Sequence, residues 1–149
     1  MQTYQQDQAL CHCQEKMKAF KSHMTKGLQR ETRIETCDNS GAKILRIISF
    51  QGGKGSKRRH VTGGLGQLFT ASVQSGNPDM RKKVVQGIIV RQCKEIRRAD
   101  GTRLKFEDNA AVVLKDNKGN LKGTLIKGAV PKEVIDRWPL IGKQAKIVV

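Results

Sequence analysis

The stretch of sequence that decides the fold is RKKVVQGIIVRQCKEIRRADGTRLKFEDNAAVVL, residues 81–114. Its first half is rich in β-branched residues, which favour a pleated, half-buried strand over a helix: Val84, Val85, Ile88, Ile89 and Val90. Gly87 interrupts this run, and a glycine inside a strand usually marks a bulge or a close backbone approach. The pattern predicts a strand that starts beside a basic cluster and continues toward Ile96.

A hairpin is expected next, at Arg97–Thr102. Asp100-Gly101 tolerates the positive φ angles of a type I′ turn, and polar and apolar residues alternate again from Thr102 to Phe106. The resulting β-ribbon would have a basic face and an arginine-rich tip, which is a suitable shape for contact with phosphates.

Outward from this stretch, the chain continues as short strands separated by turns. Strands are predicted around Ile34, at Ala42–Phe50, at Leu65–Val73 and at Thr124–Lys127, and a short helix at Lys132–Trp138 is stopped by Pro139. The apolar tail 147–149 is expected to close against the core. Many short strands with one late helix indicate a mainly β protein, a small β-barrel with terminal helical decoration. We expect the barrel to be built by Val84, Ile88, Val90, Leu104, Val112 and Leu114.

The formal charge of the chain is +16 over 149 residues, far more than solubility requires. Such an excess predicts a polyanionic partner, with nucleic acid ranked before an anionic membrane surface. No apolar run approaches the roughly 20 residues that span a bilayer, and no secretory signal is visible. The four cysteines form no disulfide framework, which favours a reducing, intracellular compartment.

Basic residues concentrate between residues 51 and 107, where thirteen Lys and Arg face four Asp and Glu. A surplus of this size is costly in self-repulsion unless a polyanion neutralises it. Aromatic residues are scarce, so we expect contacts with phosphate and sugar of a folded RNA, recognised by shape. The residues predicted to contact phosphate are Lys54, Lys57, Arg58, Arg59, Arg81, Lys82, Lys83, Arg97 and Arg98.

Three motifs raise the alternatives of an enzyme, a nucleotide-binding loop and a zinc site. Asp38 and Asp108 are the carboxylates that a small nucleic-acid-processing enzyme could use, but each is followed by Asn in a turn-like setting, which favours turn and capping roles. Gly53-Lys54-Gly55 lacks the pattern of a P-loop. Cys11-His12-Cys13 lacks the usual zinc-ligand spacing. We therefore predict no catalytic residue, no metal site and no cofactor. Two alternatives stay open: a free-standing RNA-binding regulator, and a small nucleic-acid-processing enzyme that uses Asp38 and Asp108.

The first residues differ from the others in composition. Residues 1–16 are polar and glutamine-rich, which predicts a flexible N-terminal extension, and residues 17–149 are predicted to form one β-barrel domain. Met17 lies at the change in composition and is a candidate natural start.

Several ordered motifs together resemble one family. They are Cys37–Lys43, the loop Lys54–Arg59, Gly76-Asn77-Pro78 followed by Arg81–Val84, Arg97–Thr102, Phe106–Val112, and the ending from Gly128 to Trp138-Pro139. The chain from about Met17 to Val149 closely resembles universal large-subunit ribosomal protein fourteen, in its archaeal and cytosolic eukaryotic branch.

The resemblance implies a five-stranded β-barrel with a projecting β-ribbon and short C-terminal helices. It further implies a non-catalytic ribosomal protein in the cytoplasm that binds large-subunit rRNA and joins an intersubunit bridge with small-subunit rRNA. Neighbouring ribosomal proteins and a subunit anti-association factor are the implied protein partners. By position, the family's basic loop corresponds to Lys54, Lys57, Arg58 and Arg59, and its ribbon to Arg97, Arg98 and Arg103.

Overall fold

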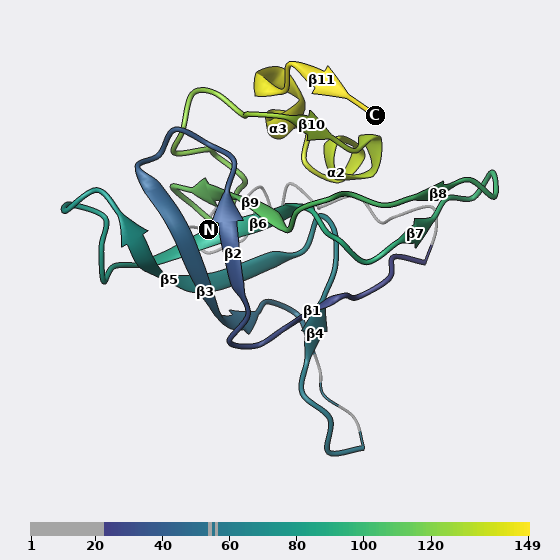
Figure 1. Cartoon of the computed structure of the whole chain (residues 1–149), viewed down its shortest axis with the longest axis horizontal. Helices are drawn as coiled ribbons and strands as arrows, with labels where there is room; N and C mark the ends of the chain where they lie inside the picture. The colour runs from purple at the N-terminus through teal and green to yellow at the C-terminus, as the bar shows by residue number, and fades with distance from the viewer. Residues whose placement is uncertain (1–22, 54, 56) are drawn as a thin grey trace, which may run out of the picture.

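Five strands close into a barrel at the centre of the computed structural model, which describes residues 23–53, 55 and 57–149 (Figure 1). The barrel strands are β2 (Arg33–Thr36), β3 (Ala42–Phe50), β5 (Leu68–Gly76), β6 (Val84–Arg91) and β9 (Ala110–Leu114). They are joined in the order β2-β3-β5-β6-β9, and every contact is antiparallel except the closing one, where β2 runs parallel to β9. The predicted mainly β, five-stranded barrel is confirmed.

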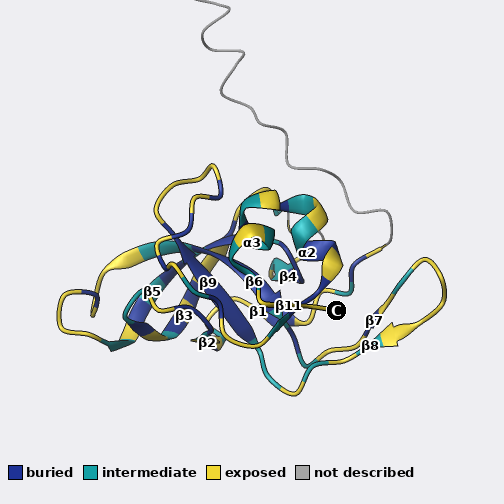
Figure 2. Ribbon diagram, turned by 90° about the horizontal axis from the view of Figure 1, so that it is seen from above, coloured by how far each residue is buried: buried dark blue, intermediate teal, exposed yellow. Residues whose placement is uncertain are grey.

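The inside of the barrel is filled by alternating side chains of the long strands. Along β3, Leu45 and Ile47 are buried while Arg46 between them is exposed, as expected for a strand with one face on the core. Every residue of β9 is buried, because this strand carries apolar side chains on both faces. In Figure 2 the buried residues run along the barrel strands and the exposed ones along the loops.

Gly87 makes a close approach at the middle of β6. It pairs with Phe69 of β5 and Val113 of β9, and a Cβ at this position would lie 2.9 Å from the Val112 carbonyl oxygen and 3.0 Å from the Phe69 ring. The Phe69 side chain is fully buried and occupies the space that a larger residue would need. The predicted close backbone approach is therefore confirmed.

Two short ribbons project from the barrel (Figure 1). In one, β1 (Leu28–Gln29) pairs with β4 (Thr62–Gly63); in the other, β7 (Ile96–Arg97) pairs with β8 (Arg103–Leu104). The second is the predicted projecting hairpin, but its turn is not type I′. Asp100 does not have positive φ and Gly101 does (φ 88°), while the Gly101 N–H donates to the Arg98 carbonyl at 3.1 Å. One left-handed glycine is enough to close this turn.

The C-terminal segment forms a small unit of two helices and two strands over one side of the barrel (Figure 1). Its elements are β10 (Ala129–Val130), α2 (Lys132–Arg137), α3 (Pro139–Gln144) and β11 (Ile147–Val148), with β10 and β11 parallel. Trp138 attaches the unit to the barrel, since its Nε1–H donates to the Gly66 carbonyl at 2.8 Å. Pro139 follows the end of α2 as predicted, but it also occupies the first turn of α3, where a residue without an N–H is tolerated.

Some predicted core positions and strands are wrong. Val84 is 65% exposed at the start of β6, and Leu104 lies half-buried in the β7–β8 ribbon, outside the barrel; Ile88, Val90, Val112 and Leu114 are buried as expected. The strand predicted at residues 65–73 lies at residues 68–76, and the one at 124–127 is a single bridge between Asp38 and Ile126. The apolar tail pairs through its backbone, so its side chains stay exposed and do not close against the core.

Candidate nucleic-acid interface

The basic loop between β3 and β4 projects away from the barrel, beyond the β1–β4 ribbon (Figure 1). Lys57, Arg58 and Arg59 are all exposed there, and Lys54 lies outside the described residues. Lys57 and Arg58 have φ angles of 50° and 58°. Two consecutive side-chain-bearing residues in the left-handed region cost about 1–2 kcal/mol each, so the backbone is held in a conformation that such residues rarely adopt.

A second basic cluster, Arg81–Lys83, forms the turn between β5 and β6. The turn is held by its backbone: the Arg81 N–H donates to the Asn77 carbonyl at 3.1 Å, and the Lys82 N–H to the Val73 carbonyl at 3.0 Å. All three cationic side chains are exposed, and Lys82 has φ 62°. Because the backbone satisfies the turn, the side chains stay available for an external anion.

The arginines of the β7–β8 ribbon look equivalent in the sequence but have different surroundings in the structure. Arg97 and Arg103 are exposed and directly opposite each other across the two strands, and like charges in this arrangement repel. Arg103 reaches Glu95 at 3.0 Å in an exposed ion pair, which is worth little in water. A bound polyanion would relieve the remaining repulsion at this pair.

Arg98, by contrast, turns back onto the C-terminal unit. Its Nε donates to Glu133 Oε1 at 2.6 Å and its Nη2 to Oε2 at 3.3 Å, with the two side chains only 15% and 10% exposed. Nη2 also donates to the Val149 carbonyl at 2.8 Å. The guanidinium of Arg98 is therefore engaged within the chain, and it fixes the base of the ribbon turn against α2.

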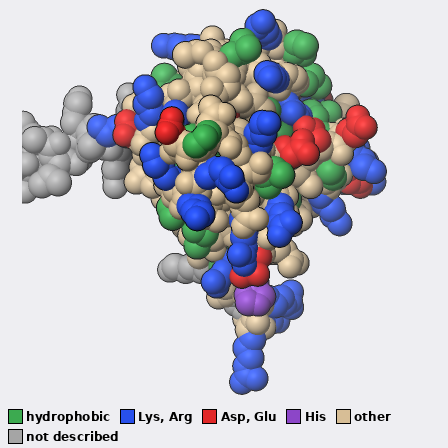
Figure 3. Space-filling view, turned by 60° about the vertical axis from the view of Figure 1, so that its left-hand side comes forward, with side chains coloured by type: hydrophobic (Ala, Val, Ile, Leu, Met, Phe, Trp, Pro, Cys, Tyr) green, Lys and Arg blue, Asp and Glu red, His purple; other side chains and the backbone are tan. Residues whose placement is uncertain are grey.

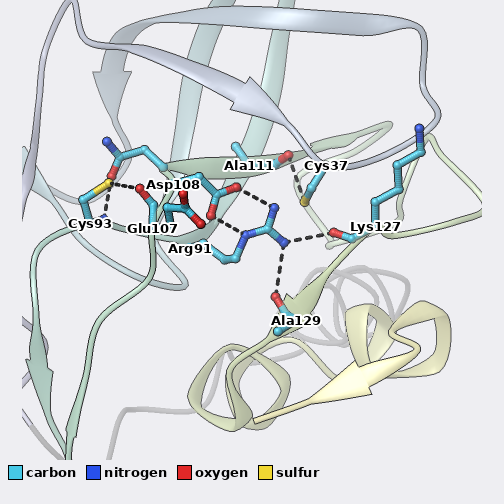
Figure 4. A network of polar contacts seen from close by, with 9 residues as sticks. Cys37, Arg91, Cys93, Glu107, Asp108, Ala111, Lys127 and Ala129 are labelled. Carbon is cyan, nitrogen blue, oxygen red and sulfur yellow. Dashed lines mark hydrogen bonds and ion pairs between the residues drawn. The ribbon is translucent and has the colours of Figure 1, made fainter.

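Arg91 joins the ribbon, the barrel and the C-terminal unit (Figure 4). Its guanidinium forms a bidentate ion pair with Asp108, in which Nε donates to Oδ1 at 2.8 Å and Nη2 to Oδ2 at 2.7 Å. Nη1 donates to the carbonyls of Lys127 and Ala129 at 2.9 and 3.3 Å. The Arg91 guanidinium lowers the pKa of the Asp108 carboxyl, chiefly by hydrogen bonding. Sequence reasoning did not identify Arg91 as the residue that positions the ribbon, because its partners are distant in the chain.

The two carboxylates considered for an enzyme do not form a catalytic couple. Asp38 Oδ2 accepts the Val113 N–H at 2.8 Å, and Oδ1 accepts the Ser40 hydroxyl at 2.7 Å. Burial raises the pKa of Asp38, while hydrogen bonds from Ser40 and Val113 oppose the rise. Asp108 is held by Arg91 as described above. Both carboxylates serve the structure: the Asp38 bonds to Ser40 agree with the predicted turn role, whereas Asp108 acts through its ion pair with Arg91 and not as a turn or capping residue.

Cysteine chemistry and metal binding find little support in the described residues. Cys37 is buried, its thiol donates to the Ala111 carbonyl, and burial raises its pKa to about 11. Residues 23–53, 55 and 57–149 contain no group of three His, Cys, Asp or Glu placed to hold a metal ion. The Cys11-His12-Cys13 candidate lies outside these residues.

On the face seen in Figure 3, Lys and Arg side chains are spread over the body of the molecule and along the protruding loop, and they outnumber the acidic side chains. No helix in the described part of the chain has the length and hydropathy needed to cross a membrane. The predicted loop, turn and ribbon cations lie on three separate projections of one barrel, and an interface that used them all would have to extend around the molecule.

Comparison with known proteins gives consistent matches over this same region. The sequence pattern of the family described as ribosomal protein L14p/L23e matches residues 27–149. The large ribosomal subunit protein uL14 of Halobacterium salinarum (strain R1) is 47% identical over 133 residues, covering 89% of this chain and all of the relative. The protein of the same name from Nanoarchaeum equitans is 44% identical over 133 residues, and that from Methanococcus maripaludis (strain S2) 47% over 132, each covering 89% of this chain.

Proposed function

Because this chain belongs to the ribosomal protein L14p/L23e family, we propose that its exposed basic projections bind large-subunit rRNA. The chain is a structural, non-enzymatic constituent of the large ribosomal subunit, located in the ribosome in the cytoplasm, with rRNA and other ribosomal proteins as its neighbours. The finer proposal concerns which residues contact the RNA and whether small-subunit rRNA is reached as well.

The observation that carries the proposal is the basic loop. Lys57, Arg58 and Arg59 are exposed and consecutive, and the four ion pairs found among the described residues leave them without a carboxylate partner. A cationic loop that extends away from the barrel can enter the groove of a folded RNA and replace condensed counterions.

The remaining predicted contacts are proposed with different roles. Arg81, Lys82, Lys83, Arg97 and Arg103 are proposed to contact phosphate directly, and Lys54 stays a prediction on the same loop. For Arg98, the ion pair with Glu133 supports a positioning role, in which it orients the ribbon for its exposed neighbours.

The salt dependence of RNA binding tests the loop. Replacing Arg58 and Arg59 by alanine is expected to reduce the log–log slope by about one to two units, because each lost phosphate contact removes about 0.7–0.9. Lys132→Ala with Lys146→Ala is the matched control, since it removes the same charge from exposed positions of the C-terminal unit. Equal slopes for the two double variants would contradict phosphate contact by the loop.

We propose further that the chain contributes to an intersubunit bridge with small-subunit rRNA and lies near the site of a subunit anti-association factor. The projecting ribbon and turn, which could span a gap between subunits, support this proposal. Hydroxyl-radical sources tethered at Ala99→Cys, Asp79→Cys or Ile147→Cys in assembled ribosomes test it. At least one site should cleave small-subunit rRNA above the background of the unmodified chain; cleavage confined to large-subunit rRNA from all three would refute the bridge.

The division of the chain also stays a proposal. We propose that residues 17–149 form the ribosomal β-barrel domain and that residues 1–16 are an extension to it; the extension lies outside the described residues. Intact mass of the protein from its source would decide whether translation starts at Met17.

A further inference from the structure

A groove of about 1040 Å³ lies on the barrel between the β5–β6 turn and the turn that follows β9. One wall comes from residues 80–86 and the other from residues 114–122, so the groove is assembled only by the fold. None of the RNA contacts predicted from the sequence lies in it except Lys83. The predicted RNA contacts therefore do not account for the basic residues that follow β9 in the wall of this groove.

The walls of the groove are strongly basic. Four lysines line it, and Asp116 is the single carboxylate among its lining residues; the lysines are Lys83, Lys115, Lys118 and Lys122. None of the four forms an ion pair with a described carboxylate. The Lys122 ammonium instead lies 2.8 Å from the Met80 sulfur, and a thioether is only a weak acceptor. The groove thus holds several cations whose charge is not balanced locally.

The groove extends into a second hollow beyond the turn. That hollow, of about 380 Å³, shares Lys115, Asp116 and Asn120 with the first and adds Lys143 of α3. Basic side chains therefore line both hollows on either side of the shared turn residues. A linear polyanion can contact more of these cations than a single small anion can.

The apolar part of the groove centres on Val84. This side chain is 65% exposed, the most exposed large hydrophobic side chain in the described part of the chain, while the half-buried Val85 and the buried Leu114 and Met80 also line the groove. Gln86, Asn117 and Asn120 stand at the sides. Amide groups beside an exposed apolar side chain can meet the flat face and the hydrogen-bonding edge of a nucleobase at the same time.

We propose that this groove binds a single-stranded segment of RNA, with an unstacked nucleobase on Val84 and the flanking phosphates on the lysines. The proposal rests on the proposed rRNA binding and adds a second contact of a different kind to it. An acidic peptide is the less favoured occupant, because its carboxylates would face Asp116 and would make no use of Val84 or the amides. The carboxylate of Asp116 can instead accept a hydrogen bond from a base amino group or a ribose 2′-hydroxyl.

The test uses the full chain and a 12-nucleotide single-stranded RNA with one 2-aminopurine, whose fluorescence rises when the base leaves its stack. Val84→Glu should weaken binding about tenfold and abolish the fluorescence rise. Val148→Glu is the matched control, because Val148 is also an exposed strand valine, 55% exposed, and receives the same charge. Lys118→Ala, compared with Lys132→Ala, should weaken binding severalfold without altering Val84.

Each outcome separates this proposal from the one before it. If Val84→Glu and Val148→Glu bind equally while Arg58→Ala/Arg59→Ala flattens the salt dependence, the groove proposal fails and the loop proposal stands. If neither the groove nor the loop variants differ from their controls, both fail. If a 12-residue polyglutamate displaces the RNA at equal concentration from the Arg58→Ala/Arg59→Ala variant, which lacks the competing loop contacts, the groove is a protein-binding surface and the proposal is overturned.

Discussion

Arg97 and Arg98 are adjacent in the sequence, yet their replacement by alanine should change different properties: Arg98→Ala should lower stability, and Arg97→Ala should lower the salt dependence of RNA binding. Arg98 and Glu133 form a bidentate pair at 2.6 and 3.3 Å with 15% and 10% side-chain exposure. Removing one member of a fully buried pair costs about 3–5 kcal/mol. Partial exposure lowers this to about 2–3 kcal/mol for Arg98→Ala, which corresponds to a fall in Tm of roughly 4–12 °C for a chain of this length.

Arg97→Ala should leave stability within about 0.5 kcal/mol, because Arg97 is exposed and takes part in none of the four ion pairs found among the described residues. It should instead reduce the salt slope of RNA binding by about 0.7. Arg98→Ala should leave that slope unchanged, measured below its lowered Tm.

Thermal unfolding and salt titrations of both variants complete the assay, and the double variant Arg98→Met/Glu133→Leu is the control. Replacing both charges by apolar side chains should restore most of the stability lost in Arg98→Ala, since no uncompensated charge stays buried. The reasoning is refuted if Arg98→Ala melts like the unmodified chain and flattens the salt slope as Arg97→Ala does, because Arg98 would then be a phosphate contact and not a structural one.

Three further predictions concern contacts that hold the fold together. Asp108→Asn should lower the free energy of unfolding by about 1–2 kcal/mol at pH 7. Because Arg91 lowers the pKa of Asp108, this loss of stability relative to the unmodified chain should be present above pH 4 and vanish as the pH falls through the folded-state pKa. Urea unfolding of both proteins between pH 3 and 7 measures it. Trp138→Phe should cost about 1–3 kcal/mol, because the buried Gly66 carbonyl loses its donor, and urea unfolding would show no change if this bond were unimportant. Cys37, with a pKa of about 11 and a buried thiol, should resist alkylation at pH 8 until the chain unfolds, whereas labelling in the native state, followed by peptide mass analysis, would contradict its burial.

The barrel could be predicted from the sequence because its strands carry local signals. The bounds of Ala42–Phe50 are predicted correctly, since a run rich in apolar residues lies between two turn motifs. Val84 was misplaced because a β-branched residue at the start of a strand looks the same whether the strand has reached the core or not. Its exposure depends on where β5 and β9 begin to cover β6, which is a property of the register and not of the local pattern.

The candidate interface was predictable only in part, for a related reason. Density of charge identified the loop and the two clusters around residues 81–83 and 97–98, but it could not separate Arg97 from Arg98, because Glu133 lies 35 residues away in the chain. Lys115, Lys118 and Lys122 were overlooked because each stands alone in the sequence. They become a basic wall only when the turn after β9 folds beside residues 80–86.

The parallel contact between β2 and β9 has a consequence for how the protein is made. β2 is the first barrel strand to leave the ribosome during synthesis, and β9 is the last. The ring closes only when Glu35 of β2 pairs with Ala110 of β9. Until then the nascent chain exposes strand edges and apolar side chains, and pairing of such distant segments is intrinsically slow. Completion of the native ring is therefore delayed until residues 110–114 have emerged, about three quarters of the way along the 149-residue chain. Before that point, binding to a chaperone or to RNA would protect the exposed strand edges.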